Sequence, residues 1–381
     1  MKKITIPKPS FDSEIVKIIL QLEKLRHQKL QGKLPPHIFF QLKEIFQLLE
    51  TLGSARIEGN RTTLAEYIDD LISGERKDEQ RLEIENLEKA IDFIEKNTDQ
   101  NTKINRAYIS ELHKIVTKGL SLPPAGEGSR TPGELRKINV EIKKSKHRPP
   151  EFVILPEYFK EFVDFINQDY EEQWQLLMIA IAHHRFAYIH PFDNGNGRMG
   201  RLLNYALLIK MGFNVGGKII NPSVVFYTDR DRYYKMLSIA DTLKDVDVLA
   251  WSEYFLVGLL NEMQKIASLL DVDYVKNNIL KHTIKSALAD KHITEKEFKV
   301  LNLVINRENM QIKAEELSEI GIKSSVTKSR IIAKLKEKKM VMPIKKKGRI
   351  YTISFVGNVL LRNVIRTLDK QGFIADFLNK N

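Results

Sequence analysis

Apolar residues recur at the three- and four-residue spacing of helix faces along most of the chain. In residues 37–52 the apolar positions are Ile38, Phe39, Leu42, Ile45, Phe46 and Leu49. The same spacing predicts further helices over residues 14–29, 62–96, 105–119, 156–168, 171–187, 201–211 and 248–270. The alternation typical of a strand is clear in this part of the chain only over residues 138–142. The sequence therefore predicts a mainly α protein.

The C-terminal part of the chain has a different pattern. Thr294 and Glu297 form a capping-box sequence that opens a helix, and a short helix over residues 314–320 ends at Gly321. A third helix is predicted over residues 324–339, and two short apolar segments, 341–344 and 350–353, flank a basic turn. Three helices and a hairpin are typical of a winged helix-turn-helix. We expect this winged helix module over residues 291–355, between a connecting helix at 271–290 and a C-terminal helix within 356–381.

Composition and charge narrow the class of protein. The 381 residues include no cysteine, which excludes a disulfide framework and is consistent with a reducing compartment. The N-terminal residues lack the apolar region of a secretory signal, and no apolar run approaches the roughly 18 residues of a membrane span. We therefore expect a cytoplasmic protein with no membrane partner. The net charge is +12, and residues 323–349 carry eleven Lys or Arg against one acid, so the basic character belongs to the C-terminal module.

Residues 189–201, IHPFDNGNGRMGR, combine a candidate base with a candidate anion site. The glycines precede an apolar helix, whose first turn offers unpaired backbone N–H groups and the positive end of the helix dipole. Arg198 and Arg201 lie three residues apart and share a face near this terminus. His190, with an ordinary pKa of about 6.5, would accept a proton from an attacking hydroxyl. The alternative is a glycine-rich turn before a core helix, with a histidine that only packs.

This stretch resembles the signature of the Fic family, HPFx(D/E)GNGRxxR, and matches eight of its nine fixed positions. The matching residues are His190, Pro191, Phe192, Gly195, Asn196, Gly197, Arg198 and Arg201. The resemblance implies a Fic-type helical core over residues 101–270 with a short β-hairpin flap, preceded by an N-terminal helical region over residues 1–100. The activity that it implies is transfer of AMP from ATP to a Ser, Thr or Tyr hydroxyl of a protein, the chain itself included, with release of pyrophosphate.

The resemblance also assigns roles to the signature residues. His190 is the catalytic base, and Asn196 with the loop amides holds the α-phosphate. Arg198 and Arg201 hold the β- and γ-phosphates. ATP is the expected substrate and Mg²⁺ the expected metal, since oxygen ligands and retained waters suit it. The full set expected to bind the ATP phosphates is Asn194, Gly195, Asn196, Gly197, Arg198 and Arg201.

One signature position departs from the family pattern. Asn194 stands where relatives have Asp or Glu, the residue that binds the metal. An asparagine offers a neutral carbonyl oxygen, so Asn194 can coordinate a metal but supplies no charge. We expect weaker metal binding, or compensation by the adjacent Asp193 through a water molecule.

Two further groups follow from the resemblance alone. The backbone of the flap would pair with the target segment, as in β-augmentation, although an ordinary edge hairpin is the alternative. The flap falls on Val140, Glu141, Ile142 and Lys143. A helix begins near residue 229, and the best matches for the residues that relatives place near the adenine are Tyr233 and Asp241. Tyr233 is by default a core aromatic, and Asp241 stands where relatives have Asn.

Residues 54–59, SARIEG, resemble the motif (S/T)xxxE(G/N) of family members with an N-terminal inhibitory helix. Its fixed positions fall on Ser54, Glu58 and Gly59. In that class the glutamate pairs with the second arginine of the signature, here Arg201, and occupies the place of the ATP γ-phosphate. A carboxylate pairs with a guanidinium in the same bidentate way as a phosphate does. On composition alone, Glu58 would be a solvated charge at a helix end capped by Gly59.

Two functions from different classes remain. The first is a protein adenylyltransferase, inhibited by Glu58, whose partner is a protein with a hydroxyl side chain. The second is a DNA-binding regulator that contacts DNA through residues 291–355 and uses the Fic core only to sense a nucleotide. The basic run suggests nucleic acid, but its lysines could equally form the solvated face of a protein-contact module. The intact His190 favours the enzyme, because a sensor needs no base. The oligomeric state is open, with a homodimer as one alternative.

Overall fold

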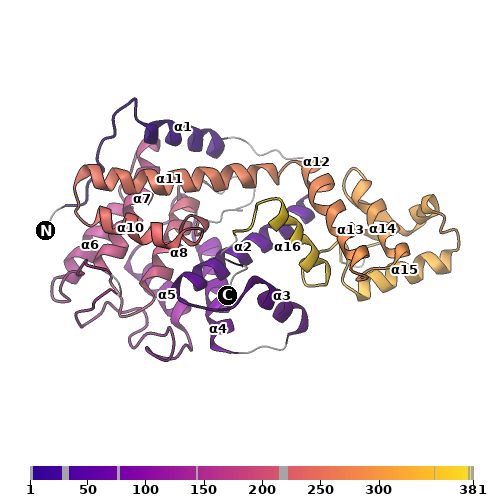
Figure 1. Cartoon of the computed structure of the whole chain (residues 1–381), viewed down its shortest axis with the longest axis horizontal. Helices are drawn as coiled ribbons and strands as arrows, with labels where there is room; N and C mark the ends of the chain where they lie inside the picture. Colours follow the sequence, from indigo (N-terminus) through magenta and orange to yellow (C-terminus); the bar gives the residue numbers. More distant parts are fainter. Residues whose placement is uncertain are drawn as a thin grey trace.

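A computed structural model describes residues 3–27, 34–74, 78–142, 145–213, 222–346, 348–375 and 378. Helices dominate these residues, and the three strands found among them all lie in the C-terminal part (Figure 1). The helices up to the end of the core are α1 (Glu14–His27), α2 (Pro36–Glu58), α3 (Leu64–Ser73), α4 (Glu79–Asn97), α5 (Arg106–Thr117), α6 (Leu155–Ile166), α7 (Glu172–Ile189), α8 (Asn196–Lys210), α9 (Val224–Tyr227), α10 (Arg230–Ala240) and α11 (Asp245–Ser268).

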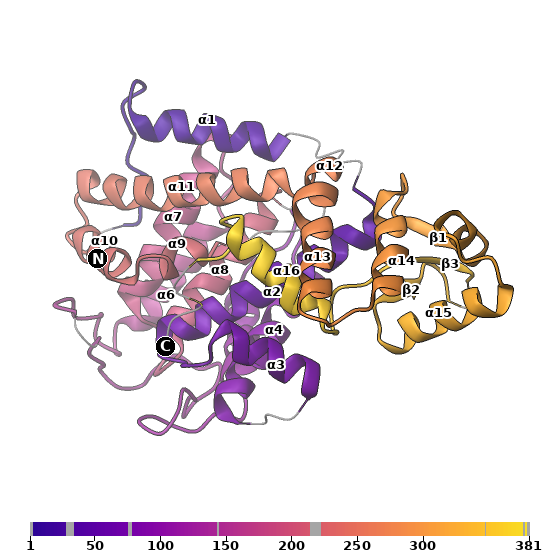
Figure 2. The ribbon, with the colours of Figure 1, turned by 45° about the vertical axis from the view of Figure 1, so that its right-hand side comes forward.

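Helices α7 and α8 form the centre of the core. From Leu176 to Phe186 each side chain of α7 is buried, as expected of a helix that is covered by others on every face. Helix α7 packs against α6, α8 and α11, while α2, α4 and α5 pack against α8. Helix α1 lies along the outer side of α11 (Figures 1 and 2). Since the loop between α7 and α8 contains the signature, the most deeply packed pair of helices positions it.

The C-terminal part is a smaller helical module with one sheet. Its elements are α12 (Val272–Tyr274), the π-helix η1 (Val275–Leu280), α13 (Lys281–Ala289), α14 (Glu295–Asn306), β1 (Gln311–Lys313), the 3₁₀-helix η2 (Ala314–Ile320), α15 (Ser325–Glu337), β2 (Val341–Pro343), β3 (Ile350–Ile353) and α16 (Leu360–Lys370). The connecting helix predicted at 271–290 is thus three adjoining helical segments.

The sheet of this module is antiparallel, in the order β1–β3–β2. Ile312 lies opposite Tyr351 in one pair of strands, and Met342 lies opposite Thr352 in the other. The predicted capping box of Thr294 is formed at the start of α14. Strand β1 was not predicted, because three residues are too few to show an alternating pattern. Helix α16 then folds back against α13 and α3 (Figure 2).

The β-hairpin flap predicted before the signature is not formed. Residues 138–142 and 145–150 are irregular, and within the described part of the chain they pair with no strand. The Asn139 side chain instead accepts a hydrogen bond from the Phe152 N–H at 2.9 Å. The physical reason is the lack of a neighbouring strand that could satisfy the backbone groups of this segment. The correction applies to Val140, Glu141 and Ile142, and Lys143 lies outside the described residues.

Within the described ranges, no helix combines the length and the apolar composition that a membrane crossing requires.

Gln41 joins α2 to the C-terminal module. It is 6 % exposed, its Nε2 donates to the Ile353 carbonyl at 3.1 Å, and its Oε1 accepts from the Phe355 N–H at 2.8 Å. The two backbone groups lie where the chain leaves β3, so one side chain closes the end of the sheet. Phe46, further along α2, makes an edge contact with Phe373, with ring centroids 6.4 Å apart. The C-terminal module therefore packs against the first half of α2.

We expect Gln41→Ala to lower the free energy of unfolding by roughly 2 kcal/mol, since it leaves a buried N–H and a buried carbonyl without their partner. Denaturant unfolding followed by circular dichroism measures the loss. The matched control is Gln21→Ala on the exposed face of α1. A difference between the two variants of less than about 0.5 kcal/mol would mean that the Gln41 bonds do not hold the module.

Candidate active site

His190 is the first residue after α7 and takes a left-handed backbone conformation, with φ 47° and ψ 63°. This conformation is uncommon outside glycine and persists only where the surroundings over-determine it. The His190 N–H donates to the Phe186 carbonyl at 3.1 Å, which closes α7. The His190 carbonyl accepts from Arg136 Nε at 2.8 Å. The proposed base therefore lies at a fixed turn between the helix and the signature loop.

Arg136 is a site residue that the sequence analysis missed. It is 2 % exposed, and besides its bond to His190 its Nη1 donates to the Ile138 carbonyl at 2.8 Å. Its Nη2 donates to the Pro150 carbonyl, and its backbone N–H donates to the Pro191 carbonyl at 2.9 Å. One guanidinium thus connects the signature loop to both ends of the irregular segment that replaces the flap.

The signature loop is built around Phe192. Asn196 Oδ1 accepts from the Phe192 N–H and Asn196 Nδ2 donates to the Phe192 carbonyl, each at 2.9 Å. Gly195, with φ 75°, supplies the left-handed turn that starts α8. Because both ends of the Asn196 amide bond within the loop, its side chain shapes the cradle. The backbone N–H groups of the first turn of α8 are the main groups available to bind an α-phosphate.

His113 supports this loop from α5 and was also missed. Its ring stacks on Phe192 with centroids 3.8 Å apart. The Gly133 N–H donates to Nδ1 at 2.8 Å, so Nε2 carries the proton and donates to the Asn194 carbonyl at 3.0 Å. Burial lowers the pKa of His113 to about 4, which keeps this hydrogen-bonded form neutral.

Arg201 is 1 % exposed and takes its hydrogen-bond partners from the end of α2. Its Nε donates to Ser54 Oγ at 2.8 Å, and its Nη2 donates to the Ser54 carbonyl at 3.0 Å and to Glu58 Oε1 at 2.7 Å. The structure thus brings together the three residues that the motif and the signature predicted. Gly197 provides the space, because a Cβ there would lie only 2.1 Å from Glu58 Oε1. A carboxylate therefore sits at the N-terminus of α8, where the sequence predicted an anion site.

Arg198 is fully buried and faces two acids that the sequence analysis did not identify. Its Nη1 lies 3.0 Å from Glu83 Oε1, and its Nη2 lies 3.3 Å from Glu127 Oε2. Glu83, on α4, also accepts from Asn60 Nδ2 at 2.8 Å. Burial raises the pKa of Glu83 despite the pull of Arg198. Both signature arginines are therefore paired with carboxylates in this structure.

Asp193 and Asn194 hold the loop of residues 121–132 onto the signature. Asp193 accepts from Ser129 Oγ at 2.5 Å and from the Arg130 N–H at 2.8 Å. Asn194 Nδ2 donates to Glu127 Oε2 at 3.2 Å and to the Gly128 carbonyl at 3.1 Å. Both oxygens of Asp193 are thereby used as an anchor, and compensation for Asn194 through a water molecule stays a prediction.

The two residues expected near the adenine have other partners. Tyr233 is 3 % exposed, and its hydroxyl lies 2.9 Å from His183 Nε2, so its ring has no open face on which a base could stack. Asp241 Oδ1 lies 3.0 Å from Nε2 of the buried His184. Burial therefore contradicts the assignment of Tyr233, which is a core aromatic. Asp241 orients a histidine, but its side chain is 20 % exposed, so its place near the adenine stays a prediction. The neighbouring Tyr234, 42 % exposed, is the aromatic ring of α10 that a ligand can reach.

Burial and neighbouring charges determine the protonation states of His190 and Glu58. Burial lowers the pKa of His190 to about 4, so the imidazole is neutral and able to accept a proton above that pH. Burial disfavours the charged form of Glu58, but Arg201 outweighs it and holds the pKa of Glu58 below its ordinary value. The pair therefore stays ionised at neutral pH, and its stabilisation is lost only as the pH falls through this lowered pKa.

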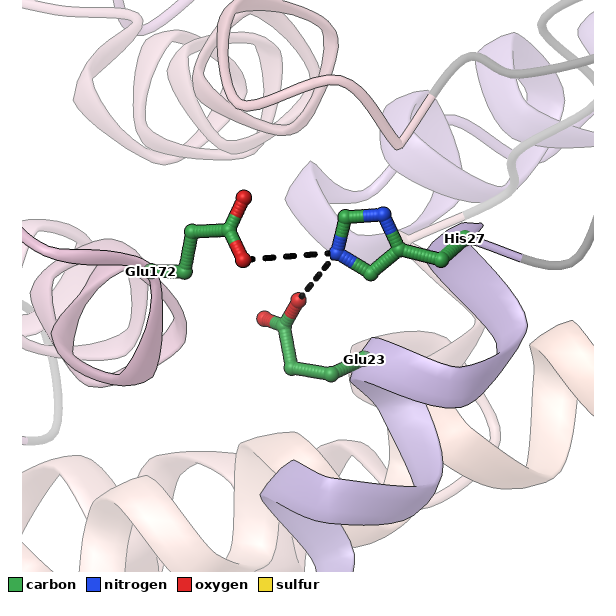
Figure 3. Close-up of side chains that lie close together, drawn as sticks. All are labelled: Glu23, His27 and Glu172. Carbon is green, nitrogen blue, oxygen red and sulfur yellow. Dashed lines mark ion pairs between the residues drawn. The ribbon is translucent and has the colours of Figure 1, made fainter.

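A second group with metal-ligand chemistry lies far from this site. Glu23 and His27 of α1 face Glu172 of α7, and His27 Nε2 lies 3.6 and 3.4 Å from the two carboxylates (Figure 3). Arg26 already pairs with Glu23 at 3.2 Å. Glu172 begins α7 and His190 follows its last residue, so the two are about 27 Å apart at 1.5 Å per residue. The contact between His27 and Glu172 joins α1 to α7, and the group takes no part in a phosphate site.

Part of the chain matches a known protein family. Residues 103–208 match the model of the Fic/DOC family. The chain therefore contains a Fic/DOC domain, which includes α5 to the last turns of α8 and the whole signature.

The curated relatives carry one name. Protein adenylyltransferase Fic of Drosophila willistoni is 31 % identical over 194 residues, which cover 49 % of this chain and 36 % of that protein. The protein of the same name from Drosophila melanogaster is 30 % identical over 194 residues, with 49 % and 36 % covered. The match thus spans about a third of the length of these relatives.

Solved structures share the fold. A Fic family protein from Desulfovibrio desulfuricans G20 aligns with a TM-score of 0.58 at 18 % identity, over 91 % of this chain and 98 % of that one. Fic-1 from C. elegans aligns with a TM-score of 0.51 at 21 % identity, over 66 % of this chain and 71 % of that one.

We expect the His190 imidazole to stay neutral from pH 9 to about 6 and to titrate near pH 4, because burial opposes its protonation. Histidine in the unfolded chain titrates at about 6.5, so protonation favours unfolding and stability falls as the pH drops below that value. NMR of protein with ¹³C-labelled histidine measures the titration, and the spectrum of His190→Ala assigns the signal. A His190 pKa near 6.5 would contradict the structure.

Proposed function

We propose that this chain is a protein adenylyltransferase whose resting form is inhibited by Glu58. The observation that carries the proposal is the 2.7 Å pair between Glu58 and Arg201 at the N-terminus of α8. The catalytic histidine candidate and an anion cradle occupy one loop, and a carboxylate already takes the anion's place. The shared name of the curated relatives supports the reaction class.

The reaction would use the residues as follows. His190 accepts the proton of a Ser, Thr or Tyr hydroxyl of the target, and the oxygen attacks the α-phosphorus of ATP. The bond from the α-phosphorus to the bridging oxygen breaks, and pyrophosphate leaves. The N–H groups at the start of α8 hold the α-phosphate, while Arg198 and Arg201 hold the β- and γ-phosphates. Tyr233 has no role in this scheme, and Asp241 would lie near the adenine.

The metal position accepts a cation of the Mg²⁺ type. Asn194 donates its amide N–H₂ to Glu127 and Gly128, which leaves its carbonyl oxygen as a ligand. When bound, Mg²⁺ would neutralise phosphate charge and orient the leaving group.

The target segment would pair with residues 138–142. Their backbone forms no strand, and the exposed part of the segment lies beside the signature through the bonds of Arg136. Backbone groups of this irregular segment that bond to no strand would accept a target chain by main-chain pairing.

Glu58 would inhibit by position. Arg201 cannot bind a γ-phosphate in its productive place while it holds the carboxylate, so an entering ATP would turn its phosphates and lose the in-line arrangement. Glu58 is 25 % exposed, whereas Arg201 is 1 % exposed, so the acid is the partner that can leave.

A second function is favoured by one observation on the C-terminal module. Helix α15 buries only Ile332 and Leu335, and the exposed remainder includes Arg330. We propose that residues 291–355 are a winged helix-turn-helix that binds DNA, with α15 in a groove and the exposed Lys345 and Lys346 of the turn between β2 and β3 on phosphates. A homodimer and a cytoplasmic location stay predictions.

We expect Glu58→Gly to raise the initial rate of AMP transfer by about 10²-fold, because it frees Arg201 for the γ-phosphate. Incorporation of label from α-labelled ATP into lysate protein and into the chain itself is the measurement. Arg201→Ala should lower the rate, and the Glu58→Gly/Arg201→Ala double variant should match Arg201→Ala alone. His190→Ala in the Glu58→Gly background should lower the rate of AMP transfer by about 10²–10⁴-fold. This control tests whether transfer takes place at the signature loop.

If Glu58→Gly is no faster than the parent, inhibition by Glu58 is wrong. If the His190→Ala control retains the rate, the transfer mechanism is wrong, whatever Glu58 does.

We expect the full chain to retain duplex DNA with an affinity that falls steeply with salt, and Lys345→Ala/Lys346→Ala to weaken it. Loss of two phosphate contacts reduces the slope of log K against log salt by about 2. Fluorescence anisotropy at several salt concentrations measures the slope. Lys96→Ala/Lys160→Ala, at 76 % and 80 % exposed positions of the core, is the matched charge control. Equal slopes for the two double variants would contradict DNA contact by this turn.

A further inference from the structure

The position that is acidic in the family signature is Asn194 here, and a different carboxylate lies beside it. Glu127 Oε2 accepts from Asn194 Nδ2 at 3.2 Å, although 67 residues separate the two in the chain. We propose that the Glu127 carboxylate is the charged ligand of the cation that accompanies the nucleotide. The side-chain oxygen of Asn194 is the second, neutral ligand. This inference rests on the proposed adenylyl transfer and names a residue that no signature position contains.

The loop that carries Glu127 is fixed to the signature at several points. The Asp193 carboxylate accepts from Ser129 Oγ at 2.5 Å and from the Arg130 N–H at 2.8 Å. Gly128, next to Glu127, lies so close to the chain that a Cβ there would be 2.3 Å from the Leu120 carbonyl oxygen. The loop therefore closes on its own first residues, which leaves no room for a larger side chain at this position. Contacts between this loop and the signature loop therefore fix the position of Glu127.

Glu127 can turn towards a cation without leaving a buried charge unpaired. Its carboxylate lies 3.3 Å from Arg198 Nη2, but Arg198 also holds Glu83 at 3.0 Å. The Glu83 side chain is 5 % exposed and the Glu127 side chain is 40 % exposed. When phosphates reach Arg198, the buried pair with Glu83 persists and Glu127 is the carboxylate that is released. Breaking the buried pair would instead leave an uncompensated buried charge, which is strongly destabilising.

The chemistry of the pair suits a hard divalent cation. Mg²⁺ and Mn²⁺ take carboxylate and carbonyl oxygens together with waters and phosphate oxygens. Asn194 alone would give the site a neutral ligand, and Asp193 is engaged elsewhere. Glu127 restores one negative charge at the position where the family pattern has it, so the asparagine and the loop glutamate together replace the signature acid.

The rival role for Glu127 is a second inhibitory carboxylate, acting on Arg198 as Glu58 acts on Arg201. The two roles predict opposite effects of Glu127→Gln. A cation ligand would weaken metal binding when neutralised. An inhibitory group would leave metal binding unchanged and speed transfer.

The test measures binding of Mn²⁺ by electron paramagnetic resonance in the presence of a non-hydrolysable ATP analogue, in the full chain with Glu58→Gly. We expect Glu127→Gln to weaken Mn²⁺ binding by about 10-fold or more, the scale at which residues around a metal act. Adding Asn194→Asp to Glu127→Gln should restore the affinity, because the double variant returns the charge to the signature position. Glu134→Gln, at an exposed glutamate paired with Lys137, is the control.

Three outcomes overturn the proposal: unchanged Mn²⁺ affinity in Glu127→Gln, no recovery in the double variant, or faster transfer with unchanged affinity. Binding of the analogue in EDTA, followed by fluorescence, separates these from a failure of the proposed function. If the analogue binds neither with metal nor without it, the proposed nucleotide site is wrong. If it binds and only the Glu127 effect is missing, the adenylyl-transfer proposal stands and the role of Glu127 does not.

Discussion

The buried guanidinium of Arg201 is the constraint on which the site depends. A charge that is 1 % exposed needs partners, and this one takes them from α2: the Ser54 hydroxyl, the Ser54 carbonyl and the Glu58 carboxylate. Removing one partner of a buried ion pair is costly, whereas exchanging it for another anion is not. The same group therefore holds α2 against α8 in the resting chain and provides the place for a phosphate. The proposed inhibition and the packing of α2 on α8 would then both depend on one charge.

Helix α2 connects that charge to the C-terminal module. Its 23 residues span about 34 Å, with Gln41 bonded to the end of β3 near one end and Glu58 on Arg201 at the other. Because both ends are held, releasing Arg201 by moving the whole helix would also break the Gln41 bonds. Rotation of the Glu58 side chain breaks neither these bonds nor those of Ser54, and its 25 % exposure gives it room. The structure thus favours a local release in the last turn of α2.

The sequence predicted what depends on local pattern and missed what depends on distant partners. Periodic apolar residues located the core helices, although the helix predicted over 37–52 runs on to Glu58 and the stretch 62–96 forms two helices, α3 and α4. The fixed spacing from His190 to Arg201 located the cradle. The pair of Glu58 and Arg201 was predicted because both belong to motifs. Arg136 and His113 have no periodic signal, and their role exists only once the chain brings them to the signature loop. The flap was wrong for a related reason, since alternation over 138–142 is a local pattern, whereas a strand needs a neighbour.

The three carboxylates around the cradle differ in burial, and this difference determines which of them a binding nucleotide would displace. Two arginines face three carboxylates whose side chains are 5 %, 25 % and 40 % exposed, those of Glu83, Glu58 and Glu127. The triphosphate brings more negative charge than the two arginines can balance beside all three acids, so carboxylates must move as it binds. The cost of moving a paired charge rises with its burial. Glu83 therefore stays on Arg198, and Glu58 and Glu127 are the groups displaced. Of these two, only Glu127 lies beside Asn194, where its displaced carboxylate can bind a cation. Glu58 has no such partner there and must leave the site.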